Sequence, residues 1–134
     1  MKLDSKKIVS VFLSEWDFEY NNPWAEEPGD NIATNYYVTV ADAKGNTWVH
    51  DWGLQSNKVH HEEARERVER MVKRIEDHLA TGGALNPKHW SNGHPQYGSV
   101  AWQRFELEEI QPAAAMVANG HDPEDLPASV AGYF

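Results

Sequence analysis

The chain has 134 residues, of which 40% are hydrophobic and 25% are charged, so it is long enough for one domain with a real core. It contains no cysteine, which excludes disulfides, a cysteine-ligated zinc site and a thiol nucleophile. The formal net charge of -9 disfavours direct binding to nucleic acid phosphates and fits either plain solubility or a basic protein partner.

The first predicted element is one long strand, or two collinear strands, over residues 7–20. Val9, Val11 and Leu13 alternate with a second set that contains Ser10 and Ser14, and acidic and aromatic residues then alternate without a break. Successive side chains of a strand point to opposite faces, so this pattern predicts one face of carboxylates and one face of rings that can be buried. The carboxylates are those of Glu15, Asp17 and Glu19, and the rings are those of Trp16, Phe18 and Tyr20.

Two further strands are predicted after a loop. Residues 21–31 are rich in Asn, Pro and Gly and predict the loop. β-branched and aromatic residues over 34–41 predict a second strand, and a turn over 42–46 leads to a third strand over 47–52. Because short turns allow only antiparallel pairing, these segments predict a meander.

The clearest element is a helix over residues 60–80, where charged residues surround one apolar stripe at helical spacing. The stripe consists of Ala64, Val68, Met71, Val72, Ile75 and Leu79. Five Arg and Lys residues of this helix alternate with Glu, which indicates a solvated, self-paired face and not a nucleic-acid interface.

The remainder is less regular. Residues 84–98 predict a loop or extended chain, residues 99–110 fit either a bulged strand or a helix, and residues 112–118 predict a short helix that ends at Asn119-Gly120. The Asp-, Pro- and Ala-rich end predicts a mobile tail that Tyr133 and Phe134 could dock.

These elements predict an α+β fold in which a three- or four-stranded antiparallel sheet packs on the helix over 60–80. We expect a single domain over 1–120, with a flexible tail over 121–134. The expected core consists of Phe12, Trp16, Phe18, Tyr36, Val38, Val40, Trp48, Val68, Met71, Val72, Ile75 and Leu79.

Catalytic and metal motifs are not evident. The seven histidines include His50-Asp51 and His60-His61-Glu62, yet none of them form a pair four residues apart on the predicted helix. The segment Tyr97-Gly98-Ser99-Val100-Ala101 lacks the second glycine of a nucleophile elbow. We therefore expect a non-enzymatic protein without cofactor or metal. It has no apolar stretch of membrane-spanning length and no signal-peptide cleavage site, which favours the cytoplasm.

Acidic residues are concentrated in two segments that lack Lys and Arg, with six acids between Glu15 and Asp30 and six between Glu106 and Asp125. Spaced carboxylates can imitate a phosphate backbone and occupy a basic nucleic-acid channel. The alternative is that they are two unrelated solvated edges whose charges discourage aggregation between exposed strands. The predicted partner is a basic host protein or nucleoprotein complex, and a homodimer is a further option. The predicted contact residues are Glu15, Asp17, Glu19, Glu26, Glu27 and Asp30.

Two alternatives stay open. The first is a small-ligand or metal-binding pocket on the third strand, formed by Trp48, His50, Asp51 and Trp52. The second is an enzyme with an unrecognised site, for which Asp51 would be the first residue to test.

One stretch resembles a known pattern. Leu85-Asn86-Pro87-Lys88-His89-Trp90, followed by Tyr97-Gly98-Ser99-Val100-Ala101-Trp102, is similar to a motif in small uncharacterised proteins of phages, plasmids and proteobacterial genomes. The resemblance covers residues 85–102 and implies a mobile-element accessory protein, a class that includes anti-defence inhibitors such as anti-CRISPRs. We expect Trp90, Tyr97 and Trp102 to anchor an extended segment, with Gly98 permitting close approach.

Overall fold

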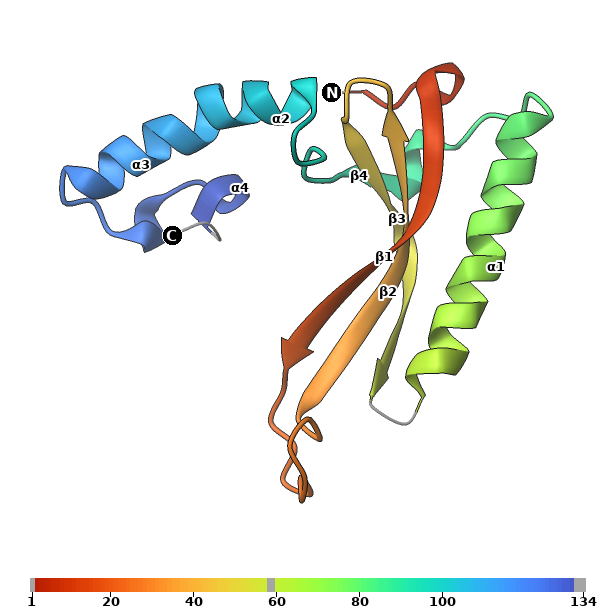
Figure 1. The fold of residues 1–134 in the computed structure, drawn as a ribbon, viewed down its shortest axis with the longest axis horizontal. Coiled ribbons are helices and arrows are strands. Elements are labelled where there is room, and N and C mark those ends of the chain that lie inside the picture. Colours follow the sequence, from red (N-terminus) through yellow and green to blue (C-terminus); the bar gives the residue numbers. More distant parts are fainter. Residues whose placement is uncertain (1, 58–59, 132–134) are drawn as a thin grey trace. The chain divides into compact units, whose positions relative to one another are not determined.

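The computed structural model describes residues 2–57 and 60–131, and the chain divides into two compact units (Figure 1). The first unit consists of Met1–Ala43 and Thr47–His94, and the second consists of Lys44–Asn46 and Pro95–Phe134. The expected domain over 1–120 therefore spans both units, and the first eleven residues of the expected tail belong to the second.

The first unit is a four-stranded sheet with one long helix, which confirms the α+β prediction. The strands follow the order β1-β2-β3-β4 and every pair is antiparallel. The sheet consists of β1 (Ile8–Glu19), β2 (Ile32–Asp42), β3 (Thr47–Asn57) and β4 (Trp90–Asn92), and α1 spans His61–Ala80. Short 3-10 turns at Ser5–Lys7 and Pro87–His89 precede β1 and β4, and β4 lies in the segment predicted as loop or extended chain.

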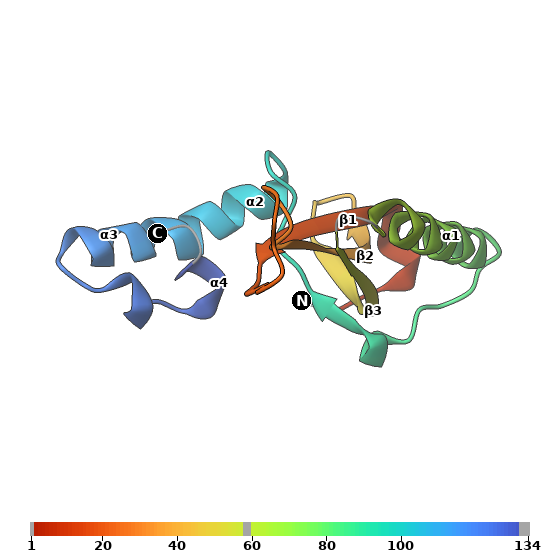
Figure 2. The ribbon, with the colours of Figure 1, turned by 90° about the horizontal axis from the view of Figure 1, so that it is seen from below.

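The helix α1 lies along one face of this sheet (Figures 1 and 2). Val38, Val40 and Val68 are fully buried at the centre of the interface, and Tyr36 and Trp48 lie beside them. Around this core pack Met71, Val72 and Leu79 of the predicted stripe. Glu62 and Glu63 occupy the first helical turn, where negative charge is favourable, and Gly82 ends the helix with a φ of 83°.

The orientation of β1 differs from the sequence prediction. Val11 lies opposite Val40 and Leu13 lies opposite Val38, and directly opposed residues share a face of the sheet. Both therefore face α1, and Glu15, Asp17 and Glu19 follow them on the same face.

The predicted core positions of Phe12, Trp16 and Phe18 are consequently wrong. Trp16 is 59% exposed, and the rings of Phe12 and Phe18 are half-buried outside the core cluster. The physical reason is that the larger apolar surface of β2 and β3 decides which face the helix covers. The rings of β1 lie on the opposite face, where Trp16 stacks on Phe18 at 5.5 Å between ring centroids.

A close backbone approach shapes β3. The register of β2 with β3 shifts between Tyr37 and Thr39, where Tyr37 pairs with Gly53 but Thr39 pairs with Val49. A Cβ atom at Gly53 would lie 2.8 Å from the carbonyl oxygen of Tyr36, so only glycine fits this position without displacement. A hollow lies over this irregular part of the sheet.

The second unit is helical. It contains α2 (Val100–Phe105), a π-helical turn η3 (Glu106–Ile110) and α3 (Gln111–Ala118), followed by a 3-10 turn at Pro123–Asp125 and α4 (Ala128–Ala131). The helix alternative for residues 99–110 is therefore confirmed. Pro112 lies two residues after the end of the π-helical turn, and its missing N–H removes one helical hydrogen bond there.

The segment expected as a mobile tail is packed up to Ala131. Leu126 and Val130 are buried with Ala113 of α3, with exposed fractions of 6%, 1% and 3%. Both the final segment and α3 have apolar residues three or four positions apart, and this spacing makes the contact possible. The expectation for Tyr133 and Phe134 lies outside the described residues.

Among the described residues, no helix combines the length and the apolar character that a membrane crossing requires.

Replacing a core residue should cost far more stability than replacing the misassigned Trp16. We expect Ile75→Ala to lower the free energy of unfolding by about 2–5 kcal/mol, because the truncation leaves a cavity beneath the sheet. Trp16→Ala should cost less than about 1.5 kcal/mol, the value of a ring pair. Urea denaturation followed by circular dichroism measures both, and an equal loss in the two variants would contradict this orientation of β1.

Candidate functional site

The predicted row of free carboxylates is only partly free. Glu15 Oε1 accepts a hydrogen bond from Arg65 Nη2 of α1, so that charge is neutralised within the protein. Asp17 Oδ1 accepts a hydrogen bond of 2.7 Å from the buried Thr34 hydroxyl. Glu19, at the end of β1, is exposed. The prediction that Glu15 is available to a basic partner is therefore corrected, because Arg65 of α1 already pairs with it, whereas the partner of Asp17 is a hydroxyl group without charge.

The loop between β1 and β2 is held by its own polar side chains. Asp30 Oδ2 accepts hydrogen bonds from the backbone N–H groups of Glu26 and Glu27, at 3.1 and 3.0 Å. The Asn22 side-chain amide donates to the Asp30 carbonyl at 2.8 Å, and its oxygen accepts from the Trp24 N–H at 3.0 Å. Asp30 thus fixes the backbone of the loop, and the exposed side chains of the loop belong to other residues.

The most conspicuous of these side chains is Trp24, which is 85% exposed. It lies in the loop beside the exposed side chains of Glu26 and Glu27, and this loop continues beyond the ends of β1 and β2 (Figure 1). We call Trp24, Glu26, Glu27 and the neighbouring Glu19 the hairpin tip. The Trp24 indole is not part of the core of the first unit.

Sequence reasoning identified the acids of this tip but not Trp24. The available signal was a large aromatic residue within a segment otherwise composed of Asn, Pro, Gly and Glu. Such a residue has few apolar neighbours along the chain with which it could be buried.

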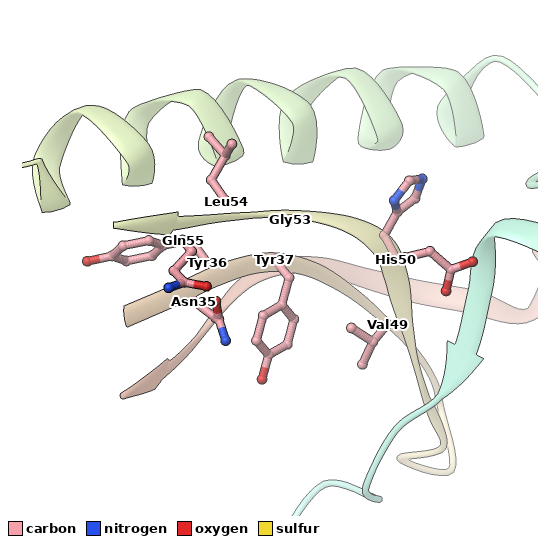
Figure 3. A pocket seen from close by; sticks show the side chains of 9 residues that line it. Asn35, Tyr36, Tyr37, Val49, His50, Gly53, Leu54 and Gln55 are labelled. Atoms are coloured by element: carbon pink, nitrogen blue, oxygen red, sulfur yellow. The ribbon is translucent and has the colours of Figure 1, made fainter. Parts of the chain in front are cut away.

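The alternative pocket on β3 does not assemble as proposed. Trp48 is 4% exposed within the core, whereas Trp52 is 39% exposed. His50 points toward α1 while Val49, Tyr37 and Asn35 point away from it (Figure 3). Asp51 accepts a hydrogen bond from the Ser91 hydroxyl at 3.0 Å. The four residues are therefore divided between the two faces of the sheet.

A hollow of about 350 Å³ does lie over this irregular part of the sheet (Figure 3). Its lining includes Asn35, Tyr37, Val49 and Gln55, and it also includes His50 and Asp51, two of the four residues predicted to form a pocket. Its polar groups are amides, a phenol and a carboxylate, which can orient a small polar molecule.

His50 occupies a partly buried aromatic setting. Its ring meets Trp90 edge-to-face at 4.8 Å and lies 6.3 Å from the ring of His89. The Trp52 N–H donates to His50 Nδ1 at 2.9 Å, so the neutral ring carries its proton on Nε2. Burial is the main cause that lowers the pKa of His50, and the nearby His89 adds to this effect.

A second histidine joins the helix to the sheet. His61 Nδ1 lies 3.1 Å from the Tyr36 hydroxyl and 3.2 Å from the Ser56 hydroxyl. Both hydroxyl-bearing residues are buried, so these hydrogen bonds fasten the first turn of α1 to β2 and β3. This polar cluster was not foreseen from the sequence because Tyr36, Ser56 and His61 come from three separate elements.

No group of three or more potential metal-ligating side chains occurs among the described residues. In comparisons with protein-family models, curated proteins and solved structures, nothing matches this chain. The first unit is a two-layer α+β structure with one acidic, aromatic hairpin tip.

The low pKa of His50 makes a pH-dependent contribution to stability. Above the ordinary histidine pKa of about 6.5, His50 is neutral in both states. As the pH falls below that value, the unfolded chain takes up the proton more readily than the folded chain, so the free energy of unfolding decreases. We expect His50→Gln to show a smaller fall in the urea midpoint between pH 7.5 and pH 5.5.

The control for this measurement is His121→Gln, which removes an exposed histidine and should retain the wild-type pH dependence. Identical slopes in the wild type and His50→Gln would show that burial of His50 does not affect stability over this range.

Proposed function

We propose that this protein is a small acidic, non-enzymatic binding protein that inserts its hairpin tip into a basic surface of a partner protein. The observation that carries the proposal is the 85% exposure of Trp24 beside the exposed carboxylates of Glu19, Glu26 and Glu27. A buried tryptophan surrounded by complementary charge is the usual composition of an interface hot spot with a polar rim.

Each component has a separate energetic role. Burial of the indole in a pocket supplies affinity, and hot-spot residues of this type contribute about 2–4 kcal/mol or more on truncation. The carboxylates raise the association rate with a basic surface and restrict the choice of partner, an effect that salt reduces. The net charge of -9 extends the attraction beyond the tip itself.

The loop is also prepared for binding. The hydrogen bonds from Glu26, Glu27 and Asn22 to Asp30, with the Tyr20 hydroxyl donating to the Asp30 carbonyl at 3.2 Å, fix its backbone before contact. A preformed loop loses little conformational entropy on binding. Asp30 thus supports the tip without itself contacting the partner.

The partner class that best fits this surface is a nucleic-acid-binding protein of the cytoplasm, whose basic groove would accept carboxylates in place of phosphates. The resemblance of residues 85–102 to mobile-element proteins supports an accessory role of this kind, such as an anti-defence inhibitor. Trp90 of that stretch is buried in the first unit, as expected of an anchor. The expectation for Tyr97 is wrong, because its side chain is 88% exposed in the second unit, and Trp102 lies in the helix α2 and not in an extended segment.

Gly98 within that stretch takes a φ of 78°, and a Cβ atom there would meet nothing within 4 Å. Its expected role in close approach is therefore corrected. Positive φ is the property that requires glycine at this position.

The proposal is tested by capture of bacterial nucleic-acid-binding proteins on the immobilised chain. We expect Trp24→Ala and the double variant Glu26→Lys/Glu27→Lys each to lose the captured proteins. We also expect heparin, a generic polyanion, and high salt to displace them from the wild type. Quantitative mass spectrometry of the eluates is the measurement.

Matched controls separate the tip from general surface effects. Tyr97→Ala removes an equally exposed ring, and Glu66→Lys/Glu76→Lys makes the same charge change on the exposed face of α1. Both should retain capture, and circular dichroism should show unchanged folding in all four variants. Capture that persists in both tip variants would refute the proposal.

The hollow over β3 favours a second candidate function, the binding of a small polar molecule. Its volume of about 350 Å³ falls in the range of ligand sites, about 300–1,000 Å³. Native mass spectrometry of the purified chain would reveal a bound molecule, and Tyr37→Ala should release it. An unmodified mass before and after mild desolvation would exclude this candidate.

A further inference from the structure

The strand β1 forms one edge of the sheet and is unusually long for that position. It has 12 residues, whereas β4 at the opposite edge has three. Among the described residues, no strand pairs with the outer edge of β1. A long edge strand presents a row of backbone donors and acceptors to which a further strand can pair.

The backbone groups on that edge can be identified. The Tyr20 N–H donates to the Asn31 carbonyl at 2.8 Å, and the register with β2 is unbroken from Glu19 back to Ser10. Because opposed residues alternate between bonded and non-bonded pairs, the even-numbered residues of β1 bond to β2. Val11, Leu13, Glu15 and Asp17 therefore direct their N–H and C=O groups to the outer edge.

The charges flanking β1 are self-complementary. Exposed Lys6 and Lys7 precede the strand, and Asp17 and Glu19 end it. In an antiparallel pair of two copies, the lysine end of each strand lies beside the acidic end of the other. The same complementarity occurs twice because the pair has two-fold symmetry.

One register satisfies both the hydrogen bonds and the side chains. With the two-fold axis at Phe12, Leu13 lies opposite Val11 of the second copy, and the acidic end of β1 lies beside the 3-10 turn that carries Lys6 and Lys7 of the second copy. Phe12 then meets its own equivalent, and Ser10 lies opposite Ser14 of the second copy. A shift of two residues in one direction sets Glu15 opposite Val11, and a shift in the other direction shortens the regular ladder to Ser10–Phe12 of each copy.

We propose that β1 pairs with β1 of a second copy in this register and joins the two four-stranded sheets into one. The irregularity between Ile8 and Ser10 limits the regular ladder to Ser10–Ser14 of each copy, with the charged ends flanking it. The dimer is independent of the proposed partner binding. It would place the two hairpin tips at opposite ends of the joined sheet, and two tips would make the protein bivalent.

Mass measurement tests the dimer directly. Light scattering of the intact chain across a concentration series should rise from 15.2 kDa to twice that mass. High salt should shift the transition to higher concentration. A mass that stays at 15.2 kDa at every concentration would overturn the proposal.

A charge-swap experiment tests whether the ends of β1 meet. Lys6→Glu/Lys7→Glu and Asp17→Lys/Glu19→Lys should each lose the dimer, because like charges then face each other. An equal mixture of the two variants should recover it, since both ends are then attractive: one charge pair keeps its original order and the other is reversed. Recovery also demonstrates that each variant is folded. A mixture that stays monomeric while the wild type is dimeric would refute pairing through β1.

The register is measured with single cysteines, which the cysteine-free chain allows without background. A residue on the two-fold axis faces its own equivalent at about 4.5 Å between Cα atoms, within disulfide range. We expect Phe12→Cys to form a covalent dimer under mild oxidation faster than Val11→Cys, Leu13→Cys or Trp16→Cys. A maximum at any other position would overturn this register.

Discussion

The packing of α1 on one face of the sheet is the contact on which the rest of the first unit depends. Val38 and Val40 of β2 and Val68 of α1 form its centre, and all three are completely buried. Burial of this kind stabilises a fold by about 25 cal/mol for each Å² of apolar surface removed from water. Once β2 is fixed against the helix, its register with β1 determines which side chains of β1 face inward.

That choice reverses the expected roles on β1. The acidic residues share the face of the helix, where Arg65 meets Glu15 and Thr34 meets Asp17. The rings of Trp16 and Phe18 stack on each other on the other face. The protein therefore neutralises part of its own acidic row, and the exposed acidity is concentrated at the hairpin tip. Solvent-exposed ion pairs such as Arg65–Glu15 add little stability, so their main effect here is to remove a charge from the binding surface.

The second unit illustrates a different dependence. Residues 100–118 form nearly continuous helix through a π-helical turn next to Pro112, and the last described segment folds back onto α3 through Leu126 and Val130. The contact of Leu126 and Val130 with α3 does not follow from a local sequence pattern, because the Asp- and Pro-rich residues around Leu126 are typical of loops. Two buried apolar side chains are enough to order the segment once the helix offers Ala113 and its neighbours.

The amino-acid sequence by itself determined the α+β class, the helix over 60–80, the three long strands and the acidic character of the first hairpin. These features depend on local periodicity, turn residues and charge, which can be recognised from residues close together in the sequence. Tertiary structure alone decided which face of β1 meets the helix and the division of the chain into two units. It also decided that Trp48 is buried whereas Trp52 and Trp24 are exposed. Each of these depends on which apolar surfaces compete successfully for burial, and that competition involves residues far apart in the sequence.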